Sequence, residues 1–428
     1  MFDNMRPHLT QAMEFLKDID RVYCVGIGGI GVSALARLFK AHGKHVSGSD
    51  HEASPLTEEL VAEGIEVEIG HKPENLPKMT DLVVYSEAIP LGNPELEDAK
   101  DRGIPIMTYF QALGGITSCQ RLVAIAGTHG KTTTTAMLSI ILERAGIDPT
   151  VVIGTKVKEF GGKNLRVGQG EIFLVEACEY RRNFLSLNPK LLGILNIEID
   201  HLDYFKSQED YEMAFQELAD QSEEVIWPDE VSEYEGELAV PGLHNKMNAG
   251  MAANLARRLG VGDLIIQEAL RDFKGTWRRF EYRGTCGGAL VYDDYAHHPS
   301  EIFATLEAAR EKHPDARIVA VFQPHQYNRT ARLLEEFAES FEEADEVIIP
   351  NIYEVRDTEE DKHAVSAEKL VDEIGKHHEN VRFGDGLEHT AEYLLETAKD
   401  GELILVMGAG DITHMIPMIL DEGVVGMA

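Results

Sequence analysis

Apolar and polar positions repeat one arrangement three times along the chain: a short run of apolar, often β-branched residues, a glycine-rich turn, and a segment with helical periodicity. The apolar runs cover Val22–Val25, Leu122–Ala126 and Leu403–Met407. Strands that are buried on both faces lack the polar alternation of half-exposed strands, so this arrangement is typical of βα units in a parallel sheet. The pattern predicts an α/β protein.

Two glycine-containing segments suggest boundaries between domains. Gly114-Gly115 precedes the second βα unit, and Tyr282-Arg283-Gly284 separates a helical pattern from the apolar strand that follows. A chain of 428 residues can build several domains of ordinary size. We therefore predict three α/β domains: Rossmann-like over residues 1–118, P-loop-type with a mostly parallel sheet over 119–283, and Rossmann-like over 284–428.

The composition argues against several classes of protein. The formal charge of -34 opposes binding to nucleic acid, whose recognition depends on phosphate neutralisation. The four cysteines are widely spaced and suggest neither a disulfide framework nor a zinc site. No run of about 18 apolar residues occurs, so we expect no membrane segment and a cytoplasmic protein.

The second glycine turn has the composition of a phosphate-binding loop. It runs from Gly127 to Thr132 between a predicted strand and a helix, where free backbone N–H groups and the helix dipole favour phosphate. Lys131 would reach the outer phosphates, and Thr132 offers a hydroxyl to Mg²⁺. Ala126 stands where the usual pattern has its first glycine, so only the second half of that pattern matches. The alternative is a surface turn without a ligand.

The first glycine turn matches a dinucleotide-binding fingerprint. Gly26, Gly28 and Gly31 open a helix, and Asp50 ends the next strand. The fingerprint fits a nicotinamide or flavin cofactor, another diphosphate, or a tight turn without a ligand. The downstream ATP loop favours a diphosphate substrate, because hydride transfer does not require ATP.

Two further strand ends carry possible metal ligands. Glu176 ends the strand that starts at Ile172, a position at which nucleotide enzymes hold Mg²⁺ with a carboxylate. Glu179 follows closely, and His201 ends the segment that starts at Asn196. A solvated loop charge and a structural histidine are the alternatives for Glu176 and His201.

Four polar segments provide further candidate ligand-binding groups. The amides of His244-Asn245-x-x-Asn248 would cap a helix or bind a purine edge, and Trp277–Phe280 would clamp phosphate or lie on the surface. Asp293–Pro299 and Phe322–Thr330 follow predicted strands. Ligands of open α/β sheets bind at such strand ends, although ordinary polar loops also occur there.

Together these segments resemble the Mur ligase family over nearly the whole chain, and most closely its members that join L-alanine to UDP-N-acetylmuramate. The matching motifs occur in the same order as in the family: Gly26–Gly31, Gly127–Thr134, Asn196–His201, His244–Asn248, Asp293–Pro299 and Phe322–Thr330.

The resemblance implies an N-terminal domain for the uridine diphosphate substrate, a central ATPase domain, and a C-terminal domain that closes over both and contributes to amino-acid binding. It implies ATP and Mg²⁺ or Mn²⁺ as cofactors, UDP-N-acetylmuramate and L-alanine as substrates, no nucleic-acid or membrane partner, and a monomer or homodimer.

The resemblance also assigns roles to individual residues. The expected catalytic residues are Lys131, Glu176, His201, His297 and Arg329. The expected ATP site contains Gly127, Thr128, His129, Gly130, Lys131, Thr132, Thr133, Asn245, Asn248, Arg279, Phe280 and Asp294. The expected metal ligands are Thr132, Glu176 and His201. The substrates are expected to contact Gly28, Gly29, Ile30, Gly31, Asp50, Ser86, Tyr295, His297 and Arg329.

Some positions depart from the family pattern. Where relatives usually have Glu-Ala-Asp-Glu-Ser-Asp, this chain has Cys178, Tyr180 and Arg181, which removes two acids and adds a cation beside the reacting carboxylate. Gln326 stands where many relatives have arginine, and Tyr109 or Phe110 replaces another arginine.

The implied chemistry is carboxylate activation by ATP, attack by the amine on an acyl phosphate, and collapse to an amide. His297 is a hypothetical general base. Three other functions stay open: a ligase that attaches a preformed tripeptide to the same acceptor, a nicotinamide-dependent oxidoreductase, and a non-catalytic nucleotide-binding regulator.

Overall fold

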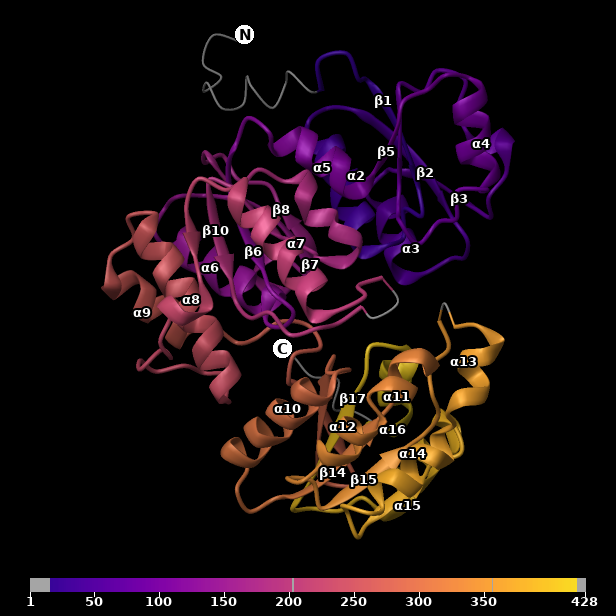
Figure 1. Ribbon diagram of the computed structural model, residues 1–428, viewed down its shortest axis with the longest axis vertical. Helices are drawn as coiled ribbons and strands as arrows, with labels where there is room; N and C mark the ends of the chain where they lie inside the picture. The colour runs from indigo at the N-terminus through magenta and orange to yellow at the C-terminus, as the bar shows by residue number, and fades with distance from the viewer. Residues whose placement is uncertain (1–15, 202–203, 356, 422–428) are drawn as a thin grey trace. The chain divides into compact units, whose positions relative to one another are not determined.

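The computed structural model describes residues 16–201, 204–355 and 357–421 (Figure 1). These residues form two compact units. The first unit comprises the chain up to Glu237 together with Met247–Phe273, and the second comprises Leu238–Lys246 and the chain from Lys274. Each unit is described by itself below.

The N-terminal sheet of the first unit has the strand order β3-β2-β1-β4-β5, with all neighbouring strands parallel. Its order is that of a Rossmann-like half, in which the central strand leads into the glycine loop. The elements are β1 (Arg21–Val25), α2 (Ile30–Ala41), β2 (His45–Asp50), α3 (Pro55–Ala62), β3 (Glu66–Ile69), β4 (Leu82–Tyr85), α4 (Pro94–Asp101), β5 (Ile106–Thr108) and α5 (Tyr109–Thr117).

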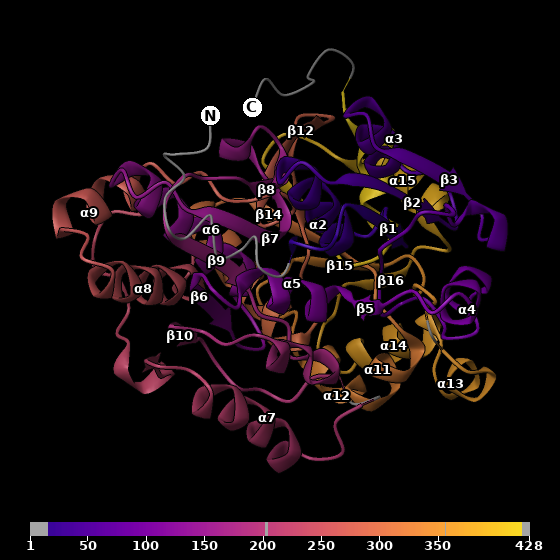
Figure 2. The same cartoon turned by 90° about the horizontal axis from the view of Figure 1, so that it is seen from above.

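Strand β1 is buried on both faces because successive side chains point to opposite sides of the sheet. Val22 and Cys24 pack into the core that contains α2, α3 and α5, whereas Tyr23 and Val25 pack against α4. Figures 1 and 2 show these helices around the N-terminal sheet. The double burial explains the uninterrupted apolar run in the sequence.

The central sheet, also in the first unit, has the order β11-β10-β6-β9-β7-β8, and only the β7–β8 pair is antiparallel. Strand β6, which leads into the Gly127 loop, lies between β10 and β9. The elements are β6 (Arg121–Ala126), α6 (Lys131–Arg144), β7 (Thr150–Val157), β8 (Lys163–Arg166), β9 (Ile172–Glu176), η3 (Tyr180–Ser186), β10 (Leu191–Ile194), α7 (Gln208–Asp220), β11 (Val225–Ile226), α8 (Leu243–Arg258) and α9 (Asp263–Arg271).

The N-terminal and central sheets share one hydrophobic core. Polar contacts reinforce it: the Asn164 side-chain amide donates to Ser33 Oγ at 3.1 Å, and its oxygen accepts from Arg37 at 2.9 Å. Lys156 pairs with Glu59 at 2.7 Å. These contacts fix the helix that follows the first glycine loop against the central domain.

The C-terminal sheet forms the second unit, in the order β12-β13-β17-β14-β15-β16. All neighbouring pairs except β12–β13 are parallel. The elements are β12 (Glu281–Cys286), β13 (Ala289–Asp294), α10 (Pro299–Lys312), β14 (Arg317–Phe322), α11 (Tyr327–Arg332), α12 (Leu334–Glu339), β15 (Glu346–Ile349), α13 (Glu359–Ala364), α14 (Ala367–Ile374), β16 (Val381–Phe383), α15 (Leu387–Thr397), β17 (Glu402–Met407) and α16 (Ile416–Ile419).

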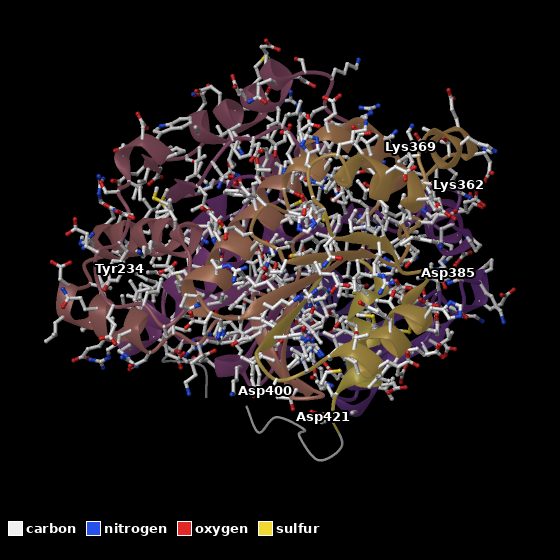
Figure 3. The ribbon with its side chains drawn as sticks, turned by 90° about the horizontal axis from the view of Figure 1, so that it is seen from below. Tyr234, Lys362, Lys369, Asp385, Asp400 and Asp421 are labelled. Atoms are coloured by element: carbon white, nitrogen blue, oxygen red, sulfur yellow. The ribbon has the colours of Figure 1, made fainter. Side chains whose placement is uncertain are left out.

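Two hydrophobic clusters cover the faces of this sheet, one with α10, α12 and α14 and the other with α15 and α16. The end of the described chain is tied to β12: the Asp421 carboxylate accepts from Thr285 Oγ1 at 2.8 Å and from the Gly287 N–H at 2.9 Å (Figure 3). No helix among the described residues is long and apolar enough to cross a membrane.

Candidate active site

The loop from Gly127 to Thr132 leaves β6 and opens α6, as the sequence predicts. Gly127 and Gly130 adopt positive φ values of 140° and 82°, which side chains disfavour. A Cβ at Gly130 would lie 2.2 Å from Oδ1 of Asn248, so the Asn248 amide packs directly on the loop. The first N–H groups of α6 have no partner within the helix and point to the region in front of this loop.

Lys131 folds back on its own loop and onto a buried carboxylate. Its Nζ donates to the carbonyls of Gly127 at 2.5 Å and Thr128 at 2.9 Å, and it pairs with Glu179 at 2.9 Å. The Glu179 side chain is only 2% exposed. Although burial opposes ionisation, Lys131 and His201 hold the pKa of Glu179 below its usual value. Lys131 and Glu179 therefore form an ionised pair.

His201 belongs to the same cluster. Its Nε2 lies 3.5 Å from Glu179 Oε1, and its ring lies 4.7 Å from the Tyr180 ring. His201 also adopts a positive φ of 55°. Glu179, which we noted in the sequence but gave no role, is thus the residue that connects Lys131 to His201.

Thr132 and Glu176 meet at the carboxyl end of β9. The Thr132 hydroxyl donates to Glu176 Oε1 at 2.8 Å, and the N–H of Gly154 donates to Oε2 at 2.8 Å. A hydroxyl and a carboxylate are oxygen ligands of the kind that Mg²⁺ and Mn²⁺ prefer. Thr132 and Glu176, two of the three residues predicted as metal ligands, therefore lie together and fit such an ion chemically.

Asn196 holds the Gly127–Thr132 loop in place, a role that the sequence did not reveal. Its side-chain oxygen accepts from the His129 N–H at 2.8 Å, and its side-chain nitrogen donates to the His129 carbonyl at 3.1 Å. The Thr128 hydroxyl donates to the Glu198 carbonyl at 2.7 Å. Only the motif from Asn196 to His201 hinted at this contact, because the bonds join segments about 70 residues apart.

The first glycine loop is arranged around Asp50. The Gly28 N–H donates to Asp50 Oδ2 at 2.7 Å, and a Cβ at Gly28 would lie 2.9 Å from the same oxygen. A Cβ at Gly26 would lie 3.1 Å from Ser86, and one at Gly31 would lie 3.0 Å from the Tyr109 ring. Gly29 and Ile30 complete the loop and start α2. The predicted residues of this loop thus lie together.

In the second unit, Asp294 organises the end of β13. Its carboxylate accepts from the Phe280 N–H at 2.7 Å and the Ala296 N–H at 2.8 Å. Burial raises its pKa to about 6. Phe280 stacks on Tyr292 with ring centroids 4.5 Å apart. The structure thus brings Phe280 and Asp294 together.

The two arginines before Phe280 have different environments. Arg278 is buried, pairs with Asp293 at 3.0 Å and donates to the Gly408 carbonyl. Arg279 lies with its guanidinium 5.2 Å from the centre of the Tyr295 ring. Of the two arginines, Arg278 is therefore structural, and Arg279 is partly accessible.

His244 and Asn245 form the start of α8. The Asn245 side chain donates to the Pro241 carbonyl at 2.6 Å. Burial, with a further contribution from Arg279, lowers the pKa of His244 to about 4. Within the second unit, Arg279 and His244 are thus electrostatic neighbours, and His244 is neutral.

His297 has its protonation pattern set by its neighbours. Its Nδ1 lies 3.0 Å from the Tyr295 carbonyl and 3.0 Å from Glu301, and both groups can only accept a hydrogen bond. Nδ1 must therefore carry a proton, which leaves Nε2 as the basic nitrogen of the neutral ring. Arg329, on α11, is 9% exposed.

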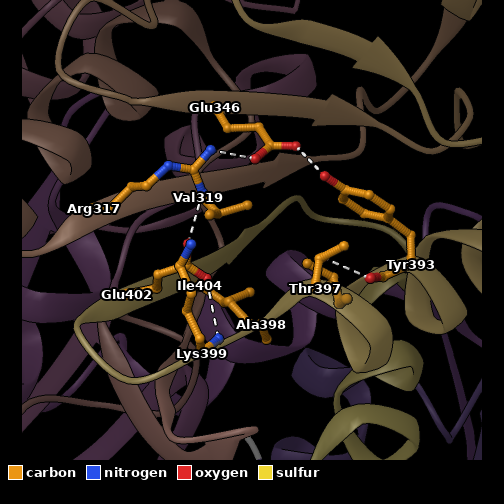
Figure 4. Close-up of a pocket in the computed structure, with 10 residues that line it drawn as sticks. Arg317, Val319, Glu346, Tyr393, Thr397, Ala398, Lys399, Glu402 and Ile404 are labelled. Atoms are coloured by element: carbon orange, nitrogen blue, oxygen red, sulfur yellow. Dashed lines mark hydrogen bonds and ion pairs between the residues drawn. The ribbon is translucent and has the colours of Figure 1, made fainter.

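A separate pocket of about 260 Å³ lies at the amino ends of β14, β15 and β17 (Figure 4). Arg317 pairs there with Glu402 at 2.9 Å and Glu346 at 2.6 Å, and the Tyr393 hydroxyl donates to Glu346 at 2.8 Å. These groups satisfy one another, and ligands of α/β sheets bind at the carboxyl ends of the strands. We assign no ligand to this pocket.

Three family models match successive parts of the chain. They describe the Mur ligase family catalytic domain, over residues 21–121, the Mur ligase middle domain, over 125–232, and the Mur ligase glutamate ligase domain, over 278–410.

Individual relatives agree with these matches. The UDP-N-acetylmuramate–L-alanine ligase of Caldanaerobacter subterraneus subsp. tengcongensis is 39% identical over 95% of this chain and 98% of its own length. That of Desulfitobacterium hafniense is 40% identical over 91% and 97%. A crystal structure of the UDP-N-acetylmuramate-alanine ligase from Thermotoga maritima superimposes with a TM-score of 0.79 at 27% identity, covering 93% of this chain and 98% of that one. The chain belongs to the Mur ligase family.

Proposed function

We propose that this chain is an ATP-dependent ligase that joins L-alanine to the carboxylate of UDP-N-acetylmuramate in peptidoglycan precursor synthesis. One observation carries the proposal: a P-loop lysine lies beside a buried carboxylate and a histidine, in the same compact unit as a glycine loop suited to a nucleotide diphosphate. The names of the relatives support the choice of substrates.

ATP is required because a carboxylate and an amine do not condense in water at useful yield. The carboxylate oxygen attacks the γ-phosphorus, which releases ADP and forms an acyl phosphate. The neutral amine then attacks the acyl carbon, and the tetrahedral intermediate expels inorganic phosphate to give the amide. Lys131, whose ammonium lies on the Gly127 and Thr128 carbonyls, would offset the negative charge of the transferred phosphoryl group.

Thr132, Glu176 and His201 are the residues that we propose as ligands of Mg²⁺ or Mn²⁺. Their hydroxyl, carboxylate and imidazole groups suit these ions. When bound, such an ion neutralises phosphate charge and orients the phosphoryl group. The Gly154 N–H holds the Glu176 carboxylate in place for this role.

For ATP, we propose that the backbone of Gly127–Thr133 cradles the phosphates. Asn248, which packs on Gly130, would lie beside the base together with Asn245 and Phe280. Arg279 would contact the nucleotide and Asp294 its ribose.

For the acceptor, we propose contacts with the loop Gly28–Gly31, Asp50 and Ser86. For L-alanine, we propose Tyr295, His297 and Arg329. Because Nδ1 of His297 donates to the Tyr295 carbonyl, Nε2 is available to accept the proton that the amine must lose. His297 is therefore our proposed general base, and Arg329 the proposed partner of the alanine carboxylate.

We propose that the domain roles follow the predicted division at residues 118 and 283, with closure of the C-terminal domain excluding water during the reaction. Both substrates and ATP are soluble metabolites, so we place the enzyme in the cytoplasm. A monomer or homodimer remains our prediction for its assembly.

The test is ADP release by the purified protein with UDP-N-acetylmuramate and, in separate reactions, L-alanine, glycine, L-serine or a preformed tripeptide. We expect release that requires the acceptor and is fastest with L-alanine. Activity with the tripeptide alone would reassign the chain to the recycling ligases, and no release with any amine would support a regulator.

A further inference from the structure

Arg181 differs from Lys131 and Arg278, two cations of the candidate site, in having no carboxylate partner among the described residues. It lies in η3, five residues after Glu176, and its side chain is exposed. Among the residues that the structure describes, no acid lies within ion-pair distance of Arg181. By contrast, the next residue, Arg182, pairs with Asp210 and Glu217, each at 2.8 Å. An unpaired arginine is notable in a chain with a formal charge of -34.

The backbone around Arg181 is held in an unfavourable conformation. Arg181 and Arg182 have φ values of 52° and 58°, in the left-handed region that residues with side chains rarely adopt. The Phe184 N–H donates to the Cys178 carbonyl at 3.0 Å, and the Arg182 N–H donates to the Glu179 carbonyl at 2.8 Å. Together with the Arg182 ion pairs, these bonds maintain the strained turn.

A stack of side chains links Arg181 to the activating cluster. The guanidinium carbon of Arg181 lies 5.4 Å from the centre of the Tyr180 ring, and the centre of the His201 ring lies 4.7 Å from that of Tyr180. Cation–π contact restricts the guanidinium without consuming its N–H donors. Arg181 thus keeps its hydrogen-bonding groups available, and the Tyr180 ring connects it to His201.

Arg181 also faces the N-terminal domain, within the same compact unit. Burial and Glu87 raise the pKa of Tyr85, and Arg181 is close enough to oppose that rise. Asn183, two residues further on, donates to Glu87 at 2.9 Å. Tyr85 precedes Ser86, which packs on Gly26 of the first glycine loop. Arg181 therefore lies between the loop proposed for the acceptor and the cluster proposed for phosphoryl transfer.

We propose that Arg181 binds the free carboxylate of the nucleotide-sugar acceptor and guides it to the activating cluster. The inference rests on the proposed function. Glu176 and Glu179 repel an incoming carboxylate, and Lys131 is already paired with Glu179. A guanidinium offers two parallel N–H donors that match a carboxylate, so Arg181 offsets this repulsion and fixes the orientation of the attacking oxygen.

The test compares two nucleotide sugars that differ in the lactyl group, which carries the free carboxylate. UDP-N-acetylmuramate has it, whereas UDP-N-acetylglucosamine has the same diphosphate and lacks the carboxylate. Titration calorimetry without ATP measures both affinities for the wild type, Arg181→Ala and Arg181→Lys. We expect Arg181→Ala to weaken the binding of UDP-N-acetylmuramate about 10- to 100-fold. The affinity for UDP-N-acetylglucosamine should stay within about twofold of the wild-type value. Arg181→Lys keeps the positive charge but lacks the two parallel N–H donors, so we expect an intermediate loss of affinity for UDP-N-acetylmuramate.

Arg271→Ala is the matched control, because it removes an exposed arginine from the end of α9 and changes the net charge equally. We expect it to bind both ligands like the wild type. The inference is overturned if Arg181→Ala weakens the binding of both ligands equally, or weakens the binding of neither. Wild-type ADP release tests the proposed function independently, and thermal melting of Arg181→Lys and Arg181→Ala separates lost binding from lost folding.

Discussion

The Gly26–Gly31 loop and the Gly127–Thr132 loop both join a buried central strand to the amino end of a helix, but different side chains surround them. Asp50 accepts from the N–H of Gly28 in the first loop. In the second, Lys131 lies across the loop and pairs with Glu179. A backbone loop beside an acid suits a ligand that is held without reacting, whereas a paired lysine supplies charge where a phosphoryl group moves. We therefore propose that loops of similar geometry serve binding in the first case and chemistry in the second.

The largest expected effect is a loss of ADP release when the lysine of the second loop is removed. Lys131→Ala removes the cation that offsets phosphoryl charge, so we expect ADP release to fall about 10²- to 10³-fold. Because the variant also leaves Glu179 without its partner, binding of UDP-N-acetylmuramate, measured by calorimetry without ATP, should weaken, but far less than ADP release falls. A comparable loss of acceptor binding would contradict the division of labour between the loops.

Glu179→Ala tests the pair that distinguishes the second loop. Removing one partner of a buried ion pair leaves the other charge uncompensated, so we expect the free energy of unfolding to fall by about 3–5 kcal/mol. Chemical denaturation measures this change. In the double variant Lys131→Met with Glu179→Ala, both charges are gone, and much of the loss should be recovered. Additive losses would show that the two side chains are not coupled.

His244, which lies outside both loops, gives an effect of pH on stability with which the loop variants can be compared. The pKa of His244 is about 4 in the folded state, below the ordinary value of 6.5, because the ring is buried. The unfolded state therefore binds more protons between these values, so the stabilisation is complete above pH 6.5 and is lost as the pH falls toward 4. We expect a loss of up to about 3 kcal/mol, and a flatter profile in His244→Leu. Denaturation curves across this pH range measure the free energy of unfolding. If it changes with pH equally in the wild type and in His244→Leu, the lowered pKa of His244 is refuted.

The smallest expected effect concerns the first loop. In Gly28→Ala the new Cβ would lie 2.9 Å from Asp50 Oδ2, and the end of that side chain can move away. We expect the KM for UDP-N-acetylmuramate to rise about tenfold while the KM for ATP stays constant, since a tenfold change corresponds to about 1.4 kcal/mol. Steady-state kinetics with each substrate varied separately decide this. A selective rise in the KM for ATP would reverse the roles of the loops.

The periodic parts of the fold were predictable from the sequence because local pattern determines them. The runs Val22–Val25, Leu122–Ala126 and Leu403–Met407 lie within β1, β6 and β17. The third predicted helix is instead a short 3-10 turn, Asp411–Met415, followed by α16. Pro417 accounts for this late start, since it fits the first turn of a helix but not its interior.

Contacts between distant segments were not predictable. Nothing in the local sequence distinguishes Arg278, buried against Asp293, from Arg279 beside Tyr295. The Asn196 clamp on His129 and the pairing of Glu179 with Lys131 likewise join segments whose proximity follows from strand order. Sequence motifs indicated which residues matter, and the fold was needed to assign their partners.

The most direct test of carboxylate activation follows an oxygen atom. UDP-N-acetylmuramate labelled with ¹⁸O in its carboxylate is incubated with the protein, ATP and L-alanine, and the inorganic phosphate is analysed by mass spectrometry. An acyl phosphate requires the carboxylate oxygen that attacks phosphorus to leave with phosphate, so the account predicts one ¹⁸O in each phosphate released. Amide formation with unlabelled phosphate would contradict it.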